Sequence, residues 1–240
     1  MAEVKSLCAA LLLTGTLGAC ATSGGNPADP LEPLNRVVFS FNDAADKAVI
    51  KPVARAYRAV LPGAVRTGVS NFFSNLEDVW ISVNDVLQGK FQQGIDDLGR
   101  VLFNSTFGIA GIFDFASELG FQKHNEDFGQ TLGSWGVGSG AYLVLPILGP
   151  SSVRDGFGLL LDTQADLVFY VDGVPVHNSL YGTRALSTRA NLLDASSVID
   201  QAALDKYSFV RDAWLQRRRN LVHDGDPPRE REEPDDEPSK

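Results

Sequence analysis

The stretch that decides the fold is VSNFFSNLEDVWISVNDVL, residues 69–87. Its apolar side chains are separated by steps of three and one, which places them along one face of an α-helix: Val69, Phe72, Phe73, Leu76, Val79, Trp80, Val83, Val86 and Leu87. The polar side chains fall elsewhere around the same cylinder: Asn71, Asn75, Asp78, Ser82 and Asp85. The pattern therefore predicts a long amphipathic helix.

Helical spacing continues upstream and downstream of this stretch. After a break at Gly89, the same period resumes in Phe91, Ile95, Leu98 and Leu102. Upstream, the sequence predicts one helical turn that Asp29 caps and Pro33 ends, and then helices over 34–50 and 52–60. These segments indicate a chain built from several amphipathic helices.

Two more helices are predicted toward the C-terminus. Ser151 or Ser152 can cap a helix whose apolar stripe runs from Val153 to Val171. The last helix carries Ala203, Tyr207, Val210 and Trp214 and ends in Arg217, Arg218 and Arg219, where cations suit the negative end of the helix dipole. No stretch shows the sustained alternation of a sheet, so we predict an all-α fold in a single domain.

The N-terminus resembles a bacterial lipoprotein signal peptide. Lys5 precedes an apolar run over 7–13, and Leu17-Gly18-Ala19-Cys20 has the order of a lipoprotein cleavage site. Cleavage there removes residues 1–19 and leaves Cys20 to carry acyl chains that anchor the protein to a membrane. The alternative is an ordinary secretory signal with a chance cysteine. Cys8 lies in the discarded segment, so the mature chain has no free thiol for disulfides, metal sites or catalysis.

The remaining chain divides into a tether, a folded domain and a tail. Residues 20–28 are small and polar and predict a flexible tether, and residues 29–222 form the helical domain. Residues 223–240 hold eight acidic and three basic residues and four prolines, which predicts a disordered acidic tail. The formal net charge is −9, and no basic excess indicates nucleic acid as a partner.

An uncharged segment over 128–153 stands out. It is interrupted by Gly129, Gly133, Gly136, Gly138, Gly140, Pro146, Gly149 and Pro150, so it is a poor transmembrane helix. Irregular backbone lies at membrane depth only where protein or a cavity surrounds it, which favours a glycine-rich hairpin over 132–146 as a channel element. Gly136, Gly138 and Gly140 are candidate hinges, and Tyr142 is a candidate channel residue. The alternative is a buried connector with tight turns.

Aromatic residues gather before this hairpin. Nine of the fourteen phenylalanines lie between residues 72 and 128. Around 103–115 the apolar residues occupy several helical faces, so this segment is either fully buried or in contact with acyl chains.

An enzyme is the rival class. The chain has three histidines, His124, His177 and His223, and no Gly-x-Ser-x-Gly elbow, because the nearest string, residues 136–140, has serine in the fourth place. Residues 124–127 (His-Asn-Glu-Asp) are interpreted as a solvated loop rather than a metal or acid–base site. We therefore expect no catalysis, no metal and no cofactor beyond the covalent lipid on Cys20.

Many short motifs stand in register along the chain, among them Asp29-Pro30-Leu31-Glu32-Pro33-Leu34-Asn35-Arg36, Asn104-Ser105-Thr106-Phe107-Gly108, Asp127-Phe128-Gly129-Gln130-Thr131-Leu132-Gly133 and Gly149-Pro150-Ser151-Ser152-Val153-Arg154-Asp155. In order and spacing they resemble the MlaA (VacJ) outer-membrane lipoproteins. The resemblance covers roughly residues 29–218, and Ala141 departs from it, since proline is expected before Tyr142. Among the motif positions, eight are candidate site residues: Asn35, Arg36, Phe41, Asn42, Asn104, Asp114, Arg154 and Asp155.

The resemblance implies a ring of helices around a central amphipathic channel, held in the inner, periplasmic leaflet of the outer membrane. It also implies association with a porin trimer, removal of phospholipids that have strayed into the outer leaflet, and their transfer to a soluble periplasmic phospholipid carrier. Ala21 after the lipidated cysteine agrees with an outer-membrane location. The alternative function is a structural envelope lipoprotein that braces porins without moving lipid.

Overall fold

The computed structural model describes residues 26–228. Its helices and strands are α2 (Glu32–Ala45), η2 (Asp46–Ile50), α3 (Lys51–Val60), α4 (Gly63–Leu87), α5 (Phe91–Thr106), α6 (Phe115–Glu118), α7 (Phe128–Ser134), β1 (Tyr142–Leu145), β2 (Gly149–Ser152), α8 (Val153–Ala165), η3 (Leu167–Tyr170), α9 (Val174–Asn191), α10 (Leu193–Ala202) and α11 (Lys206–Val222). The predicted signal peptide, Cys20, most of the tether and residues 229–240 lie outside the described residues.

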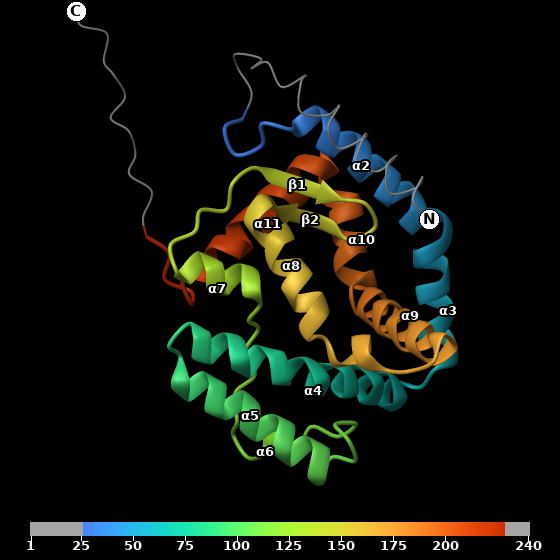
Figure 1. Ribbon diagram of the computed structural model, residues 1–240. Helices are drawn as coiled ribbons and strands as arrows, with labels where there is room; N and C mark the ends of the chain where they lie inside the picture. The colour runs from blue at the N-terminus through green and yellow to red at the C-terminus, as the bar shows by residue number, and fades with distance from the viewer. Residues whose placement is uncertain (1–25, 229–240) are drawn as a thin grey trace, which may run out of the picture.

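The elements follow one another around a ring (Figure 1). α2 runs through η2 into α3, which packs on α9, and α9 packs on α4. α4 contacts α7, α7 contacts α8, and β2 and β1 close the circuit onto α2. α5 and α6 lie on the side of α4 that faces away from the ring. The predicted all-α single domain is confirmed.

Two details of the first helices correct the prediction. Asp29 does not cap a short turn, and Pro33 does not end a helix, because Pro33 lies in the first turn of α2, where the missing N–H is not needed. The predicted gap between helices at Lys51 is also wrong. Lys51 N–H donates to the Asp46 carbonyl, so one turn of π-helix carries the chain without a break into α3 and past Pro52.

Within the described residues, the sequence also missed a small sheet and four helices, α6, α7, α9 and α10. β1 and β2 form an antiparallel pair in which Tyr142 faces Ser152 and Leu145 faces Gly149. α9 and α10 were not predicted, because the residues they bury are few and mostly small: Ser187, Ala190 and Leu193.

The apolar core is small and divided. One cluster joins Ala54, Ala190 and Leu193, and the other joins Tyr142, Val144 and Tyr207. Within residues 26–228, nineteen buried side chains are polar or charged and ten are apolar. Apolar residues normally dominate a protein interior, so this molecule is unusual in what it buries.

Candidate functional site

The predicted hairpin over 132–146 is displaced in the structure: residues 132–134 belong to α7, and β1 and β2 form the hairpin over 142–152, which lies against α2. Tyr142 and Val144 of β1 are buried in the second apolar cluster, whereas Ile147 and Leu148 at the tip are 60% and 68% exposed. Ile147 has a φ of 66°, a left-handed conformation that few β-branched residues adopt. The hairpin therefore presents an apolar tip on a buried base.

Two asparagines of α2 hold the hairpin. Asn35 Nδ2 donates to the Tyr142 carbonyl at 2.9 Å, and its Oδ1 accepts from the Val144 N–H at 2.9 Å. Asn42, two turns later, repeats the arrangement with the Leu145 carbonyl at 2.9 Å and the Ile147 N–H at 2.8 Å. Each amide pairs with one carbonyl and one N–H, as a neighbouring strand does. These two motif positions fix the hairpin to the ring.

The three candidate hinge glycines differ in what their positions require. Gly140 has a φ of 68°, and a Cβ there would lie 3.0 Å from the Val153 Cβ, so only glycine fits without strain. Gly136 has a φ of 91° and open space around it. Gly138 has an ordinary φ and open space, so nothing in the structure requires glycine there.

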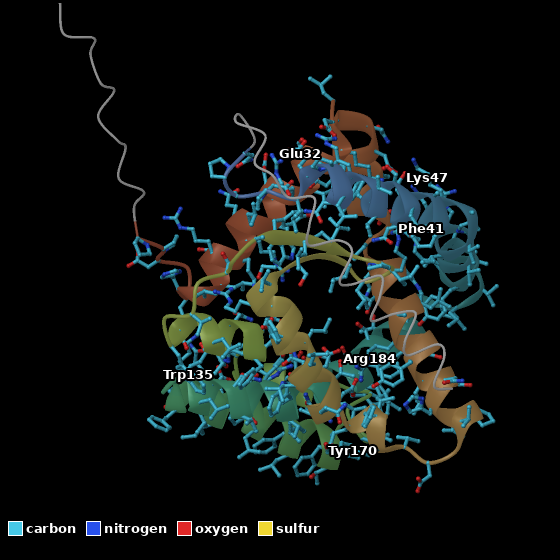
Figure 2. The ribbon with its side chains drawn as sticks, turned by 45° about the horizontal axis from the view of Figure 1, so that its top comes forward. Glu32, Phe41, Lys47, Trp135, Tyr170 and Arg184 are labelled. Carbon is cyan, nitrogen blue, oxygen red and sulfur yellow. The ribbon has the colours of Figure 1, made fainter. Side chains whose placement is uncertain are left out.

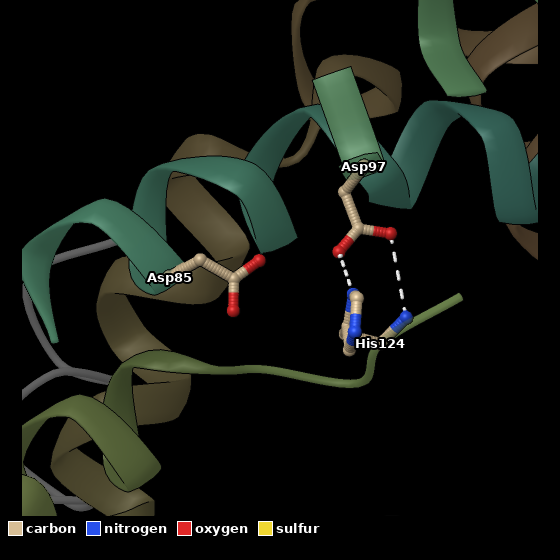
Figure 3. A group of neighbouring side chains, drawn as sticks. All are labelled: Asp85, Asp97 and His124. Atoms are coloured by element: carbon tan, nitrogen blue, oxygen red, sulfur yellow. Dashed lines mark hydrogen bonds and ion pairs between the residues drawn. The ribbon is translucent and has the colours of Figure 1, made fainter. Parts of the chain in front are cut away.

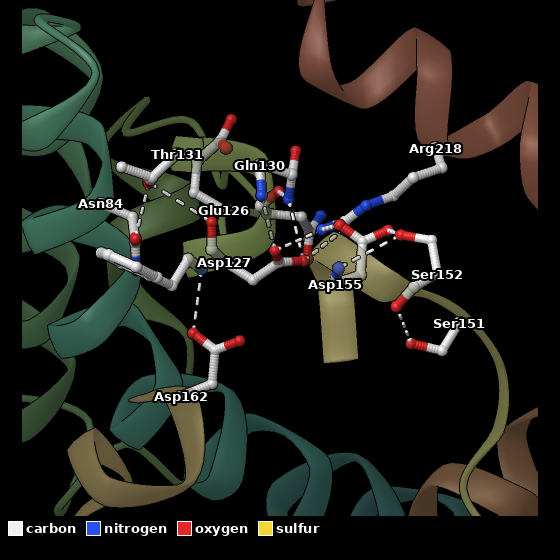
Figure 4. A network of polar contacts seen from close by, with 12 residues as sticks. Asn84, Glu126, Asp127, Gln130, Thr131, Ser151, Ser152, Asp155, Asp162 and Arg218 are labelled. Atoms are coloured by element: carbon white, nitrogen blue, oxygen red, sulfur yellow. Dashed lines mark hydrogen bonds and ion pairs between the residues drawn. The ribbon is translucent and has the colours of Figure 1, made fainter. Parts of the chain in front are cut away.

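A network of polar contacts joins α7, α8 and α11 behind the hairpin (Figure 4). Arg218 donates to both oxygens of Asp127, at 2.5 and 2.6 Å, and to Asp155 at 2.9 Å. Asp127 also caps α7 through the Gln130 N–H, and Asp155 exchanges hydrogen bonds with the capping residue of α8, Ser152. Figure 4 shows these side chains meeting from three elements at one point.

The electrostatics of this network follow from its geometry. Burial alone would raise the pKa of Asp127, but the bidentate bond from Arg218 outweighs it and holds that pKa below its usual value. Burial raises the pKa of Asp162, which accepts hydrogen bonds from Trp80 of α4 and from the Phe128 N–H. Asp162 therefore ties α4, α7 and α8 together where the ring closes.

Two hollows flank the network. A groove of about 1160 Å³ lies between the loop over 133–139 and α11, and its lining combines apolar side chains with arginines: Val137, Trp214, Leu215, Val222, Arg154, Arg218 and Arg219. A smaller hollow of about 260 Å³ lies on the hairpin side and includes Leu145, Leu148 and Leu159. Trp214 and Arg218 line both. This combination suits an amphipathic molecule with an anionic head.

The exposed surface is rich in large apolar side chains. On α5, the residues with the predicted helical period are all exposed: Phe91, Ile95, Leu98 and Leu102, by 50% to 63%. The opposite face of α5 is buried against α4 and carries Gly94, Asp97, Arg100 and Asn104. The helix is therefore inverted, with its polar side inward and its apolar side outward. Apolar surface of this extent marks contact with a membrane or a partner.

The segment after α5 continues this surface. Phe107, Ile109, Phe113, Phe115 and Leu119 are each 45% to 63% exposed. Of the two alternatives for the aromatic segment, full burial is thus excluded. Figure 2 places the exposed Trp135 and Tyr170 at the rim of the molecule and Arg184 nearer its middle, where Arg184 pairs with Asp166 at 2.6 Å.

No helix in the part of the chain that the structure describes is both long enough and apolar enough to cross a bilayer.

The structure brings most of the candidate site residues together at the hairpin. Asn35, Gly140 and Tyr142 lie at its base and Asn42 lies near its tip, and Gly136 and Gly138 lie in the loop that leads to it. Arg154 and Asp155 stand beside that loop, with Arg154 Nη1 donating to the Val137 carbonyl at 3.3 Å.

The other four candidates lie elsewhere. Arg36 pairs with Glu32 and Asp205 at 2.7 Å each and stacks on the Tyr207 ring. Phe41 is 57% exposed on α2. Asn104 and Asp114 organise the turn after α5: Asn104 Nδ2 donates to Asp114 Oδ1 at 3.0 Å, and Asp114 caps α6. Burial would raise the pKa of Asp114, but bonds from Ser117, Asn104 and Arg100 lower it to about 2.

Sequence reasoning missed two parts of the site. It treated Arg218 only as a cation at a helix end, and it did not single out Trp214 as a lining residue. The spacing of Asp127 and Gln130 is an N-cap signal that the sequence offers. The interpretation of residues 124–127 as a solvated loop is wrong, because Glu126 is buried and His124 Nδ1 lies 2.7 Å from Asp97 Oδ2.

Several known proteins are similar to this chain. The Escherichia coli strain K12 protein named intermembrane phospholipid transport system lipoprotein MlaA is 34% identical over 227 residues, 92% of this chain and 90% of that protein. The Haemophilus influenzae protein of the same name is 31% identical over 233 residues, 93% and 92% of the two chains. Both are named as transport lipoproteins rather than enzymes.

A solved structure described as "Structural basis for maintenance of bacterial outer membrane lipid asymmetry" has the same fold. It matches with a TM-score of 0.72 and 34% identity, over 81% of this chain and 98% of that chain. The family description "MlaA lipoprotein" matches residues 27–221. The chain therefore belongs to the MlaA lipoprotein family.

Proposed function

We propose that this chain removes mislocalised phospholipids from the outer leaflet of the outer membrane through an amphipathic channel and passes them to a soluble periplasmic carrier. It thereby maintains lipid asymmetry. The names of its relatives, which refer to intermembrane phospholipid transport and outer-membrane lipid asymmetry, support this function.

The physical requirement is a polar path beside an apolar one. A phospholipid that changes leaflets carries a charged head through hydrocarbon, where an unpaired charge costs at least about 2.5 kcal/mol and by some estimates far more. Polar groups that line the path lower that barrier, and apolar walls accept the acyl chains. No covalent bond has to change, so the process needs no catalytic group.

The observation that carries the proposal is the inverted burial of the ring. Polar and charged side chains fill the contacts between its helices, and large apolar side chains cover its exposed surface. The groove between the 133–139 loop and α11 adds a lining of apolar side chains and arginines. Such a molecule is stable where acyl chains replace water on its outside.

The rest of the proposal concerns placement and partners. Acyl chains on Cys20 hold the domain in the periplasmic leaflet, since several chains anchor stably where one does not. The exposed apolar surface of α5 and α6 sits among lipid tails, and a porin trimer holds the ring in register with the membrane. The carrier takes up phospholipid on the periplasmic side.

The test measures phospholipid at the cell surface. A strain that lacks the gene is complemented with the natural chain or with a variant, and intact cells are treated with an amine-reactive probe that labels exposed phosphatidylethanolamine. Deletion is expected to raise the labelling, and the natural chain to restore it. Cys20→Ala is expected to fail at equal protein abundance. Equal labelling with and without the gene would contradict the proposal.

A matched pair of variants tests the hairpin. Gly140→Val places a Cβ against Val153 at a left-handed φ, whereas Gly138→Val meets open space at an ordinary φ. Only Gly140→Val is expected to change surface labelling. If both variants behave like the natural chain at normal abundance, the hairpin is not part of the path.

Mass spectrometry of the detergent-purified protein separates transport from bracing, because co-purifying phospholipid favours transport and porin alone favours bracing.

A further inference from the structure

Three groups from separate segments meet beside α4 (Figure 3). Asp85 comes from α4, Asp97 from α5 and His124 from the segment that leads into α7. One donor atom of each lies within 4.8 Å of the others. The proposed transport does not use these three side chains.

The two carboxylates face each other because the helices approach closely. Gly94 of α5 packs against α4, and a Cβ there would lie 3.3 Å from the Asp85 Cβ and 3.1 Å from the Ser82 carbonyl oxygen. Asp85 and Asp97 are both fully buried. The packing of two helices thus brings two acids together out of contact with water.

Asp85 has no hydrogen-bond partner. Both of its carboxylate oxygens are buried and unpaired, and Figure 3 shows the group directed toward Asp97 and His124. By contrast, Asp97 is fully engaged: Oδ1 accepts from the His124 N–H at 3.3 Å, and Oδ2 lies 2.7 Å from His124 Nδ1. A buried carboxylate without a donor is costly unless something else occupies the position it faces.

Nearby charges do not supply the missing partner. Lys90 is the nearest cation, and its Nζ is bonded to Glu126 at 3.1 Å and to Asp224 at 2.5 Å. Lys90 is therefore already paired with two other carboxylates and does not neutralise Asp85. Asp85, Asp97, Glu126 and Asp224 together leave this region with an excess of negative charge.

We propose that Asp85, Asp97 and His124 bind a divalent transition-metal cation. Two carboxylate oxygens and one imidazole nitrogen form a donor set that zinc and manganese both accept, with water in the remaining positions, one for tetrahedral zinc and three for octahedral manganese. Two donors held at about 2.1 Å from one ion in a tetrahedron lie about 3.4 Å apart. Donors as far apart as 4.8 Å therefore approach each other on binding, whereas His124 Nδ1 and Asp97 Oδ2, which lie 2.7 Å apart in the metal-free structure, separate. The His124 N–H holds Asp97 in place, as outer hydrogen bonds do in metal sites.

The imidazole of the proposed site borders a hollow that opens to solvent. His124 lines an open hollow of about 230 Å³ together with Gln93, Asn125 and Glu126. The bound ion links α4, α5 and the segment before α7, so it braces the junction where the inverted helix α5 meets the ring. Its role is structural, and its absence loosens this junction without removing any transport group.

The test uses the full chain, purified in detergent without a histidine tag. After removal of metal by a chelator, zinc chloride and manganese chloride are added separately, and the bound metal and the thermal unfolding temperature are measured. One ion per chain and a raised unfolding temperature with either metal are expected. Asp97→Asn and His124→Gln are expected to weaken binding by more than about 100-fold, because the loss of even an outer partner costs about 10- to 100-fold.

Matched controls keep the result specific. Asp96→Asn changes the neighbouring acid on α5, and His177→Gln changes a partly buried histidine on α9, away from the proposed site, so both are expected to bind metal like the natural chain. The site is supported if metal raises the unfolding temperature of the two control variants but not that of the two ligand variants. If Asp97→Asn does not fold, His124→Gln decides alone.

A proton is the competing occupant. In the absence of a cation, burial and the facing Asp97 raise the pKa of Asp85 to about 8, so a proton shared by the two acids can also neutralise the excess charge. No stabilisation by either metal, together with an Asp85→Asn variant at least as stable as the natural chain, would overturn the proposal. Metal binding that the ligand variants retain would overturn it as well.

Discussion

The α4–α5 pair and the hairpin region differ in the kind of side chain that they bury. Around the hairpin, Tyr142, Val144 and Tyr207 form an ordinary apolar cluster, and polar groups hold its edges. Between α4 and α5, the buried side chains are mainly polar or charged, and the apolar face of α5 is exposed. The hairpin region therefore keeps an apolar cluster at its base, whereas α5 turns its polar side inward and exposes its apolar side.

The comparison teaches that burial has a different meaning in each region. In the hairpin region, the apolar cluster contributes stability by leaving water. In the α4–α5 pair, stability depends on specific partners such as Arg100, which donates to Asp78, Asp114 and Ser117 at 3.0 to 3.3 Å. A lost contact should therefore cost more, and be harder to replace, in the polar region.

The largest expected effect is on the polar region. Arg100→Met removes the guanidinium that faces Asp78, whose side chain is 1% exposed, and leaves buried carboxylate charge with fewer partners. We expect the free energy of unfolding to fall by about 3–5 kcal/mol, measured by chemical denaturation in detergent. The control Arg55→Met changes an exposed arginine and should stay within about 0.5 kcal/mol. Similar losses for the two variants would contradict the comparison.

A smaller effect is expected where α2 holds the hairpin. Asn42→Asp keeps the size of the side chain but loses the Nδ2 donor to the Leu145 carbonyl and sets a carboxylate against it. The expected loss is about 1–3 kcal/mol, with faster hydrogen exchange over residues 142–152. Ser40→Ala, which changes a helical neighbour that bonds only the Arg36 carbonyl, should leave that exchange unchanged. Equal protection in Asn42→Asp and the natural chain would mean that α2 does not hold the hairpin.

A single oxygen distinguishes two tyrosines of the apolar cluster. The Tyr142 hydroxyl is buried without a partner, and burial raises its pKa. Tyr142→Phe is therefore expected to raise the free energy of unfolding by about 1 kcal/mol. Tyr207→Phe should lower it by a similar amount or more, since that hydroxyl donates to Asp29. Thermal unfolding of both variants checks the direction of each change in stability. If Tyr142→Phe also lowers the stability, the Tyr142 hydroxyl has a hydrogen-bond partner.

The smallest effect on unfolding is expected from the exposed face of α5. Leu98→Asn and Leu102→Asn change side chains that are 50% and 61% exposed, so unfolding should shift by less than about 0.5 kcal/mol. Flotation of the purified protein with phospholipid vesicles should weaken in the double variant, because the apolar contact with the membrane is lost. Leu193→Asn changes a buried side chain, so it should lower the free energy of unfolding and leave flotation unchanged. Unchanged flotation would place α5 away from lipid.

The sequence predicts the helices of the long periodic segments, but it does not tell which face is buried. The period of Phe91, Ile95, Leu98 and Leu102 identifies one side of α5, and nothing in the period says whether protein, lipid or water lies there. In an amphipathic helix of a water-soluble protein, aspartates such as Asp78, Asp85 and Asp97 are expected on the solvent-exposed face. Only the packing of α4 against α5 shows that here they are buried.

The hairpin and its network depend on contacts between distant residues. Gly149-Pro150-Ser151-Ser152 has no strand pattern and forms β2 by pairing with β1, while two asparagines more than 100 residues earlier in the chain hold β1. The bond from Arg218 to Asp127 spans 91 positions. Local spacing does not specify such pairs. The family resemblance marked Asn35 and Asn42 as important, and the structure supplies the reason.

The polar interior has a thermodynamic consequence. Unfolding raises the heat capacity mainly by hydrating apolar groups that were hidden, and exposing polar groups lowers it. A chain that buries more polar than apolar side chains, and already exposes many large apolar ones, gains less heat capacity per residue than the usual value of about 12–15 cal/mol/K. Its free energy of unfolding should therefore change only gently with temperature. Calorimetry of the purified domain should give a small heat-capacity change of unfolding, and hence a flat curve of stability against temperature.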